Sequence, residues 1–331
     1  MNRHLKIMFA VSIVLAMLVS ACAPAATKVP ATKIPATQVP APKRKVAVLF
    51  PGSVSDHSWN QFGYEGLLRA QKECGVEIAY SENVTQDEQI EVIRNYVAEG
   101  YDMVIGHGGE YQDALAVVAE EHPDKQFGVA DGEAVTANMS GTRLSFRQMG
   151  YLAGILACNM TKSNHVAYVV GELYPGADEG AEGYRTGAAT CGKDVKVDYI
   201  ATGDWADVAM AREAGLTLIA SGVDVLWHML DTADAGLISA AEDNGVWAIG
   251  LYRDSSSLGP KAVVGSTLGS PGAMIYELAC GYGVPGKTIP VTVNTAGGLD
   301  MSLTDLCPKD VQAKVLDALA KMRSGEINIE P

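Results

Sequence analysis

Short apolar runs alternate with amphipathic stretches along residues 45–324 of the chain. The run 45–50 (KVAVLF) is apolar and rich in β-branched residues, which is typical of a strand buried on both faces of a parallel sheet. Similar runs recur, and stretches with helical periodicity separate them. The predicted strands are 45–50, 77–80, 102–105, 126–130, 166–170, 196–200, 223–227, 247–251 and 262–266. The predicted helices are 59–74, 87–99, 111–121, 147–160, 181–190, 207–220, 233–244, 271–282 and 309–324.

The order of these elements predicts an α/β fold. Strands and helices alternate with short connections up to residue 130, and the alternation starts again near residue 147, which is the pattern of doubly wound parallel sheets. We therefore expect two Rossmann-like lobes that close about a hinge of crossover strands. The expected boundaries give the first lobe 45–145 plus about 262–288, and the second lobe 146–261 plus about 289–331.

The first 21 residues predict a signal peptide. Arg3 and Lys6 give a positive start, and 7–19 is an apolar run too short to span a bilayer comfortably. The run ends in VSAC at positions 19–22, the aliphatic-small-small-Cys pattern of a bacterial lipobox. Proteins with this pattern are cut before the cysteine and acylated on it, so we expect Cys22 to anchor the mature chain in a membrane. The alternative is an ordinary secreted protein.

A repeated pentapeptide follows Cys22. Three copies (ATKVP, ATKIP and ATQVP) occupy 26–40, and a proline at every fifth position opposes both helix and sheet hydrogen bonding. Residues 22–44 are therefore expected to form an extended tether that holds a globular body away from the membrane surface.

The body beyond residue 45 is strongly acidic. The chain has 25 Lys and Arg residues and 39 Asp and Glu residues, and seven of the basic residues but none of the acidic ones lie in 1–45. The body therefore has 18 basic against 39 acidic residues, a formal charge of −21. This charge disfavours nucleic acid or anionic lipid as a partner of the body itself. Its apolar runs are all shorter than a membrane span.

Five cysteines remain after Cys22, namely Cys74, Cys158, Cys191, Cys280 and Cys307. None of them has C-x-x-C spacing, and the six histidines form no H-x-x-x-H pair, so neither a metal site nor a redox motif is expected. At most two disulfides can form, with one thiol left over. Five buried thiols is the prediction that we favour.

Ligands of doubly wound sheets bind beyond the carboxyl ends of the strands, and two facing lobes can line a shared cleft with these ends. The candidate residues there are Asp56, Trp59, Asn60, His107, Glu110, Asp131, Asp204, Trp205, His228, Asp231 and Asp254. Tryptophans, carboxylates and an asparagine suit a flat heterocycle with N–H groups. The structural alternatives are that Trp59 only packs its helix, that the acids near Trp205 cap a helix, and that the histidines are satisfied by internal hydrogen bonds.

Motifs of enzymes do not stand out in the chain. The segment 265–269 (GSTLG) lacks the frame of a nucleophile elbow, and His107-Gly108-Gly109 has no partnered serine. Neither a phosphate-binding loop nor a dinucleotide fingerprint follows the first strand. We therefore expect neither enzymatic activity nor a cofactor, and a nucleoside hydrolase is kept as an alternative.

The segment 56–61 (DHSWNQ), followed by Gly63 and Glu65-Gly66, resembles the D-x-S-[FW]-N-Q…E-G signature of the basic membrane protein (PnrA-like) lipoproteins. These are type I substrate-binding proteins of ABC transporters. Further similar segments lie in order along the body, at 127–131, 151–154, 160–162, 183–188, 222–225, 249–254 and 324–327. The resemblance implies a type I periplasmic-binding-protein fold and a purine-like ligand. It also implies ABC permease and ATPase subunits as partners, and a body outside the cytoplasm, held at the cell membrane by Cys22.

The resemblance further implies which residues bind the ligand. Family members hold a purine between two aromatic residues, one from each lobe, and Trp59 and Trp205 match these positions. Asn60 and Asp131 match the residues that contact the base.

Specificity for the sugar depends on other positions. Nucleoside-binding members hold ribose with an acid matching Asp254 and a lysine, and Gly269 stands at the lysine position. A ribose-contacting acid at the end of the first strand is replaced by Phe50-Pro51, and Asp231 resembles the variant found in members that bind free bases. We therefore expect a purine nucleobase or related heterocycle. The alternatives are a nucleoside-binding member of the same family and a ligand-sensing receptor lobe for a signalling partner.

Overall fold

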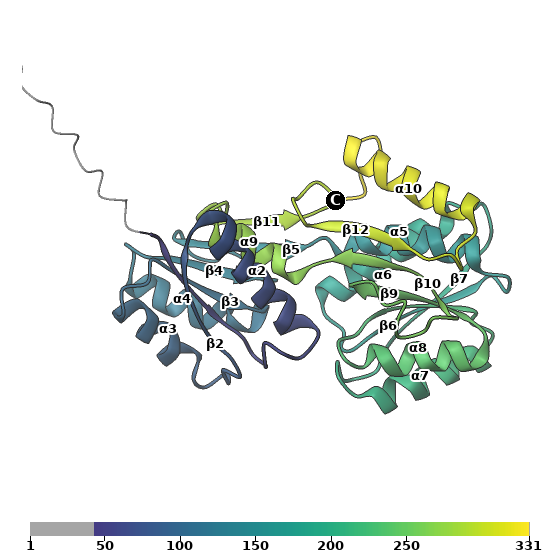
Figure 1. Ribbon diagram of the computed structural model, residues 1–331, viewed down its shortest axis with the longest axis horizontal. Helices are drawn as coiled ribbons and strands as arrows, with labels where there is room; N and C mark the ends of the chain where they lie inside the picture. The colour runs from purple at the N-terminus through teal and green to yellow at the C-terminus, as the bar shows by residue number, and fades with distance from the viewer. Residues whose placement is uncertain (1–42, 331) are drawn as a thin grey trace, which may run out of the picture. The chain divides into compact units, whose positions relative to one another are not determined.

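The structure is a computed structural model that describes residues 43–330 of the chain. These residues form two six-stranded sheets with helices around them (Figure 1). The strand order of the first sheet is β11 (Lys287–Val291), β5 (Met139–Leu144), β4 (Gln126–Ala130), β3 (Met103–His107), β1 (Lys45–Leu49) and β2 (Glu77–Ser81). The strand order of the second is β12 (Leu299–Leu303), β10 (Val263–Gly269), β9 (Trp247–Tyr252), β8 (Val225–Met229), β6 (His165–Val170) and β7 (Lys196–Ala201). The expected signal peptide at 1–21, Cys22 and the tether up to residue 42 lie outside the described residues.

Neighbouring strands of both sheets are parallel, except that β10 and β12 are antiparallel. Strand order reverses between β1 and β3 in the first sheet and between β6 and β8 in the second. Such reversals leave a crevice at the carboxyl ends of the strands. The expected α/β architecture of two doubly wound lobes is confirmed, and it is the type I periplasmic-binding-protein fold.

Helices cover both faces of each sheet. On the first sheet, α2 (Trp59–Cys74) and α9 (Pro271–Ala279) pack on one face, and α3 (Gln89–Ala98) and α4 (Gln112–Glu121) pack on the other. On the second sheet, α5 (Phe146–Met160) and α6 (Pro175–Ala189) lie opposite α7 (Val208–Ala220) and α8 (Asp234–Asn244), and α10 (Lys309–Ser324) packs on α5. We refer to each sheet with its helices as the first and second lobe. Within residues 43–330, none of the helices is long and apolar enough to cross a membrane.

Strand β1 shows why the apolar runs form central strands. Val46 and Val48 join the core beneath α2 and α9, whereas Leu49 joins the core beneath α3 and α4. Because both faces of β1 are buried, every position after Lys45 must be apolar.

The chain passes between the lobes three times, after β5, after β10 and after β11. The expected boundaries differ from this at two places. Strand β10 lies in the 262–288 segment assigned to the first lobe, but it pairs with β9 in the second, where Val264 is part of the core. Strand β11 reaches beyond residue 288 and pairs with β5 in the first lobe. The structure also contains three strands that the sequence pattern did not predict: β5, β11 and β12.

The prediction of five buried thiols is wrong. Cys74 at the end of α2 forms a disulfide with Cys280 after α9, and Cys158 in α5 forms one with Cys191 after α6. Cys307 is a buried free thiol. Both bridges join helices that pack side by side, a proximity that sequence spacings of 206 and 33 residues did not reveal.

Candidate ligand-binding site

A cavity of about 620 Å³ lies between the lobes, at the carboxyl ends of the strands. Its volume is within the range of about 300–1,000 Å³ found for small-molecule sites. The lining residues are Pro51, Gly52, Trp59, Asn60, Gly108, Gly109, Glu110, Asp131, Glu172, Tyr174, Trp205, Met229, Leu230, Asp231 and Tyr252. Five of the six residues expected to bind ligand are therefore brought together: Trp59, Asn60, Asp131, Trp205 and Asp231.

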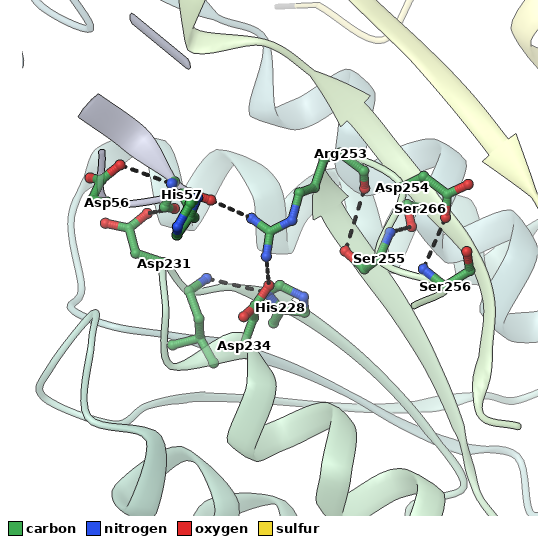
Figure 2. Close-up of polar contacts among 12 residues, drawn as sticks. Asp56, His57, His228, Asp231, Asp234, Arg253, Asp254, Ser255, Ser256 and Ser266 are labelled. Carbon is green, nitrogen blue, oxygen red and sulfur yellow. Dashed lines mark hydrogen bonds and ion pairs between the residues drawn. The ribbon is translucent and has the colours of Figure 1, made fainter. Parts of the chain in front are cut away.

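Asp254 is the exception. It is exposed, and its Oδ1 accepts the Ser256 N–H at 2.9 Å (Figure 2). It is not among the residues that line the cavity. Tyr252, the last residue of β9, lines the cavity instead. The structure therefore does not bring Asp254 together with the other five expected residues.

The start of α2 positions Trp59 and Asn60. The Asp56 carboxylate accepts the backbone N–H groups of Ser58, Asn60 and Gln61 and the Asn60 side-chain amide, at 2.8–3.1 Å. Burial of Asp56 favours the neutral acid, but these hydrogen bonds hold the pKa of its carboxyl below the usual value. A charged carboxylate at a helix N-terminus also complements the helix dipole.

Asn60 is fixed from both ends of its side-chain amide. Its Nδ2 donates to Asp56, and its Oδ1 accepts the Gly52 N–H at 3.2 Å. Because an amide nitrogen carries two hydrogens, the second remains available as a donor to an acceptor atom in the cavity.

Trp59 is supported from below by a histidine. Its indole stacks on the His107 ring with centroids 4.5 Å apart, and the backbone oxygen of Trp59 lies 2.9 Å from His107 Nε2. Burial lowers the pKa of His107 to about 4, so the imidazole is neutral at pH 7 and pairs with this carbonyl as a donor. The imidazole covers one indole face, and ligand contacts are left to the other.

Trp205 approaches the cavity from the second lobe. Its indole packs directly over Gly171 after β6, where an added Cβ would lie 2.3 Å from the ring. The Tyr174 ring meets the indole edge to face, at 5.9 Å between centroids. The Trp205 carbonyl accepts the Asp231 N–H at 3.0 Å, so this hydrogen bond joins two loops of the site.

The acids near Trp205 have the structural role that was the alternative. Asp207 Oδ1 accepts the Met210 N–H at 2.9 Å as the N-cap of α7, and Asp204 accepts two backbone N–H groups of its own turn. Neither lines the cavity.

Two carboxylates line the cavity, Asp131 from the first lobe and Asp231 from the second. Asp131 follows β4 with a φ of 60°, a conformation that non-glycine residues rarely adopt outside functional turns. Burial raises the pKa of Asp131 to about 6, although Arg143 favours its charged form. Burial likewise raises the pKa of Asp231 to about 6, opposed by a hydrogen bond from the Ser58 hydroxyl at 3.0 Å. Both side chains can accept N–H groups of a ligand.

The two candidate histidines lie within strands, His107 at the end of β3 and His228 in β8, and both are buried. His107 is fully buried beneath Trp59, and His228 is buried with its Nδ1 accepting the Leu230 N–H at 3.3 Å (Figure 2). Burial lowers the pKa of His228 to about 3. Neither lines the cavity, and residues 43–330 contain no cluster of three or more potential metal ligands.

Several lining residues were missed by the sequence analysis. Tyr174 and Glu172 both lie in the loop between β6 and α6. Tyr252 is the last residue of β9 and has a φ of 63°. The rule that ligands bind beyond strand ends would have pointed to the loop after β6.

Comparisons with known proteins show the family of the chain. Residues 43–302 match the family Bmp, described as ABC transporter substrate-binding protein PnrA-like. The chain is 30% identical to the transcriptional activator protein med of Bacillus subtilis, over 68% of this chain and 70% of that protein. It is 27% identical to the ABC transporter nucleoside-binding protein BmpA of Lactococcus lactis, over 83% and 84% of the two chains.

A further relative is a purine-binding protein of Brucella abortus, which is 25% identical over 86% of this chain and 83% of its own length. The family match covers most of the chain and both lobes. The chain therefore belongs to the Bmp family of PnrA-like ABC transporter substrate-binding proteins.

Proposed function

We propose that this protein is the lipid-anchored substrate-binding protein of an ABC importer and that it binds a purine nucleobase or a related heterocycle in the interlobe cavity. The observation that carries the proposal is the position of Trp59 and Trp205, which line one cavity from opposite lobes together with Asp131 and Asp231. Two indoles can stack on a flat ring while the carboxylates accept its N–H groups. The protein binds its ligand without turnover and passes it to permease and ATPase subunits.

The surroundings of three residues favour a base over a nucleoside. Asp231 lies in the cavity, whereas Asp254, which matches a ribose-contacting acid, does not. Gly269 matches the ribose-contacting lysine, and a Cβ there would lie 2.9 Å from the side chains of Met149 and Leu299. A longer side chain at this position would have to displace the ends of these two side chains. A nucleoside would thus bring hydroxyl groups into a site without these partners, which costs affinity.

Calorimetric titration tests the proposal. Adenine, guanine, hypoxanthine and xanthine are compared with their own nucleosides, and the base is expected to bind more tightly in each pair. Asp231→Ala is expected to lose affinity for the bases, and Asp254→Ala serves as the matched control and is expected to bind like wild type. A clear preference for any nucleoside over its own base contradicts the base assignment, while the transporter role would stand.

The importer role has its own tests. Mass spectrometry of the ligand that co-purifies with the native protein identifies the solute directly. Genes for an ATPase and permeases beside the gene of this protein would agree with import, whereas a neighbouring signalling protein alone would favour a receptor lobe. Conversion of inosine or guanosine by the purified protein would contradict binding without turnover.

A further inference from the structure

Three consecutive residues of the first lobe, His57, Ser58 and Trp59, are each contacted by the second lobe. Arg253 Nη1 donates to the His57 carbonyl oxygen at 2.8 Å. The Ser58 hydroxyl donates to Asp231 Oδ1 at 3.0 Å. The Tyr252 ring lies 6.3 Å from the Trp59 ring. Figure 2 shows the Arg253 guanidinium reaching His57 beside Asp231.

Arg253 is held in place within its own lobe. Its Nη2 donates to Asp234 Oδ2 at 3.2 Å, and Asp234 is only 3% exposed at the start of α8 (Figure 2). The two ends of the guanidinium thus have different partners, a carboxylate in the second lobe and a backbone carbonyl in the first. A planar guanidinium suits such a bridge because its N–H groups have fixed directions.

The backbone on both sides of the bridge has an uncommon conformation. His57 has a φ of 60°, and Tyr252, which precedes Arg253, has a φ of 63°. Residues other than glycine rarely adopt this region, and such residues concentrate at binding sites and switches. The residue with this conformation in the first lobe, His57, is the one whose carbonyl oxygen accepts the hydrogen bond from Arg253. The two turns therefore place the Arg253–His57 hydrogen bond next to the stacking residue Trp59.

We propose that Arg253 is a latch for lobe closure, a positioning residue that increases the affinity of the cavity for every ligand without touching the ligand. Arg253 does not line the cavity, and it holds the segment that carries Trp59 against the second lobe. If ligand binds fully only when the lobes are closed, the apparent affinity scales with the closed fraction. The inference rests on the proposed function only in assuming that the cleft holds the ligand.

A latch and a ligand contact predict different patterns of loss. Removing a latch lowers the affinity for all ligands by one common factor, because the closed fraction is a property of the protein. Removing a ligand contact lowers affinity by factors that depend on the group contacted. The latch also slows release, so its loss is expected to appear mainly as a faster dissociation rate.

The experiment compares Arg253→Ala with Arg212→Ala. Arg212 makes a similar ion pair with Asp243 at 2.8 Å, but it lies within the second lobe between α7 and α8. Adenine and hypoxanthine are titrated into each variant, and small-angle scattering compares the proteins without added ligand. For Arg253→Ala we expect about tenfold weaker binding of both bases, in line with the loss of a hydrogen bond from a charged donor, and a larger radius of gyration. Arg212→Ala is expected to match wild type in both measurements.

A second variant shows whether a loss of affinity comes from the missing latch or from unfolding of the protein. Arg253→Ala leaves the buried Asp234 carboxylate without its cation, which destabilises folds, whereas the double change Arg253→Met with Asp234→Asn removes both charges. The double variant is expected to show the same common loss while melting near the wild-type temperature. Wild-type affinity in a folded double variant, or unequal losses for the two bases, overturns the latch.

The two proposals can fail separately. If wild type binds none of the purines, the proposed function is wrong, but the scattering comparison still tests the latch. Identical scattering of wild type and Arg253→Ala would then overturn the latch as well, and a larger radius for the variant would support it.

Discussion

At the scale of the residue, each of the two tryptophans of the cavity has a different support. Trp59 lies on the neutral imidazole of His107, while Trp205 lies on the bare backbone of Gly171. Both supports hold the indole on one side and leave the other side to the cavity. A flat ligand therefore meets preformed surfaces, so less side-chain entropy is lost on binding.

Trp59→Ala and Trp205→Ala are each expected to weaken binding of a purine base by about 1–3 kcal/mol, the range for stacking of one aromatic side chain on a base. Isothermal calorimetry measures the loss. Trp247→Ala is not a suitable control because this side chain packs against the core of the second lobe. Leu316→Ala on the exposed face of α10 is a suitable control. Unchanged affinity in both tryptophan variants would contradict stacking between the lobes.

Binding is also expected to depend on pH. Burial raises the pKa values of Asp131 and Asp231 to about 6, so both carboxyls are largely charged at pH 7 and largely neutral at pH 5. A ligand N–H prefers the charged acceptor, and binding therefore favours deprotonation. Affinity is expected to be full above about pH 7 and to fall as the pH drops through 6.

Titrations between pH 5 and 8 measure this dependence with a base that does not itself titrate in the range. Asp231→Asn removes one of the two titrating groups, so its affinity is expected to change less steeply with pH. A flat profile for wild type would show that the ligand does not donate to these carboxyls.

The sequence predicted the residues of the cavity only where they follow a strand. Trp59, Asn60, Asp131, Trp205 and Asp231 were found by this rule together with the family resemblance. Tyr252 directly follows the predicted strand 247–251 but was not named as a candidate residue; it lines the cavity with a φ of 63°. The presence of a tyrosine at one position of a sequence does not reveal that its backbone has a positive φ.

At the scale of the element, polar residues or a proline interrupt the apolar pattern of each strand that escaped prediction. β11 (KTIPV) contains Pro290, which is tolerated because β11 lies at the edge of the first sheet. β12 is the antiparallel edge of the second sheet and exposes Asp300. β5 buries Ser140 and Thr142, so hydrophobicity alone does not mark it. Central strands were predicted because burial on both faces demands apolar residues.

Helix α6 begins six residues before the predicted start at 181. Pro175 occupies its first turn, where proline is favoured, but the sequence PGADEG is typical of a loop. Packing against α5 explains why α6 contains glycines. Gly183 and Gly187 face α5, and a Cβ on either would lie 2.1 Å from a carbonyl oxygen of that helix.

Gly187→Ala is expected to destabilise the fold by about 1–3 kcal/mol, the usual cost of overpacking a core. The added methyl would overlap the Tyr151 carbonyl, so α5 and α6 would have to separate, and the nearby Cys158–Cys191 disulfide opposes this. Urea unfolding measures the change. Thr186→Ala on the exposed side of α6 is the control and is expected to be neutral or slightly stabilising, since alanine is the better helix former. Equal stability of Gly187→Ala and wild type would contradict the close contact.

At the scale of the whole molecule, the lobe boundaries could not be read from the sequence. Each crossover is a short segment between elements that look alike in both lobes, and only pairing shows that β10 continues the second sheet. Two lobes follow from the repeated alternation of strands and helices, but the three passages between them depend on contacts between distant residues.

The N-terminal region adds a prediction that rests on the sequence alone. The lipobox ending at Cys22 and the proline tether predict an acylated N-terminus, so Cys22→Ala is expected to release the body from the membrane fraction. Fractionation of cells followed by immunoblotting measures the release. Mass spectrometry of the mature wild-type protein provides the control, and an unmodified Cys22 within an intact N-terminal peptide would refute the anchor.

The charge of the molecule predicts which ligands the cavity rejects. Glu110, Asp131, Glu172 and Asp231 line it, and within residues 43–330 no Lys or Arg does. Arg143 and Arg253, which favour the charged forms of Asp131 and Asp231, are already paired, Arg143 with Glu133 and Glu179, and Arg253 with Asp234. An anionic ligand would therefore meet uncompensated negative charge in addition to the formal −21 of the body.

Purine-6-carboxylate and purine-6-carboxamide differ in charge but hardly in shape, and they form a matched pair for this test. The carboxylate is expected to bind at least about tenfold more weakly, because like charges about 4 Å apart near a protein surface repel by several kcal/mol before screening. Calorimetry at 50 mM and 500 mM salt measures both ligands, and the difference is expected to shrink at high salt as the charges of the cleft are screened. If the carboxylate bound as tightly as the carboxamide at low salt, the cavity would have to offer an anion a positive partner, and the ligand class proposed here would be wrong.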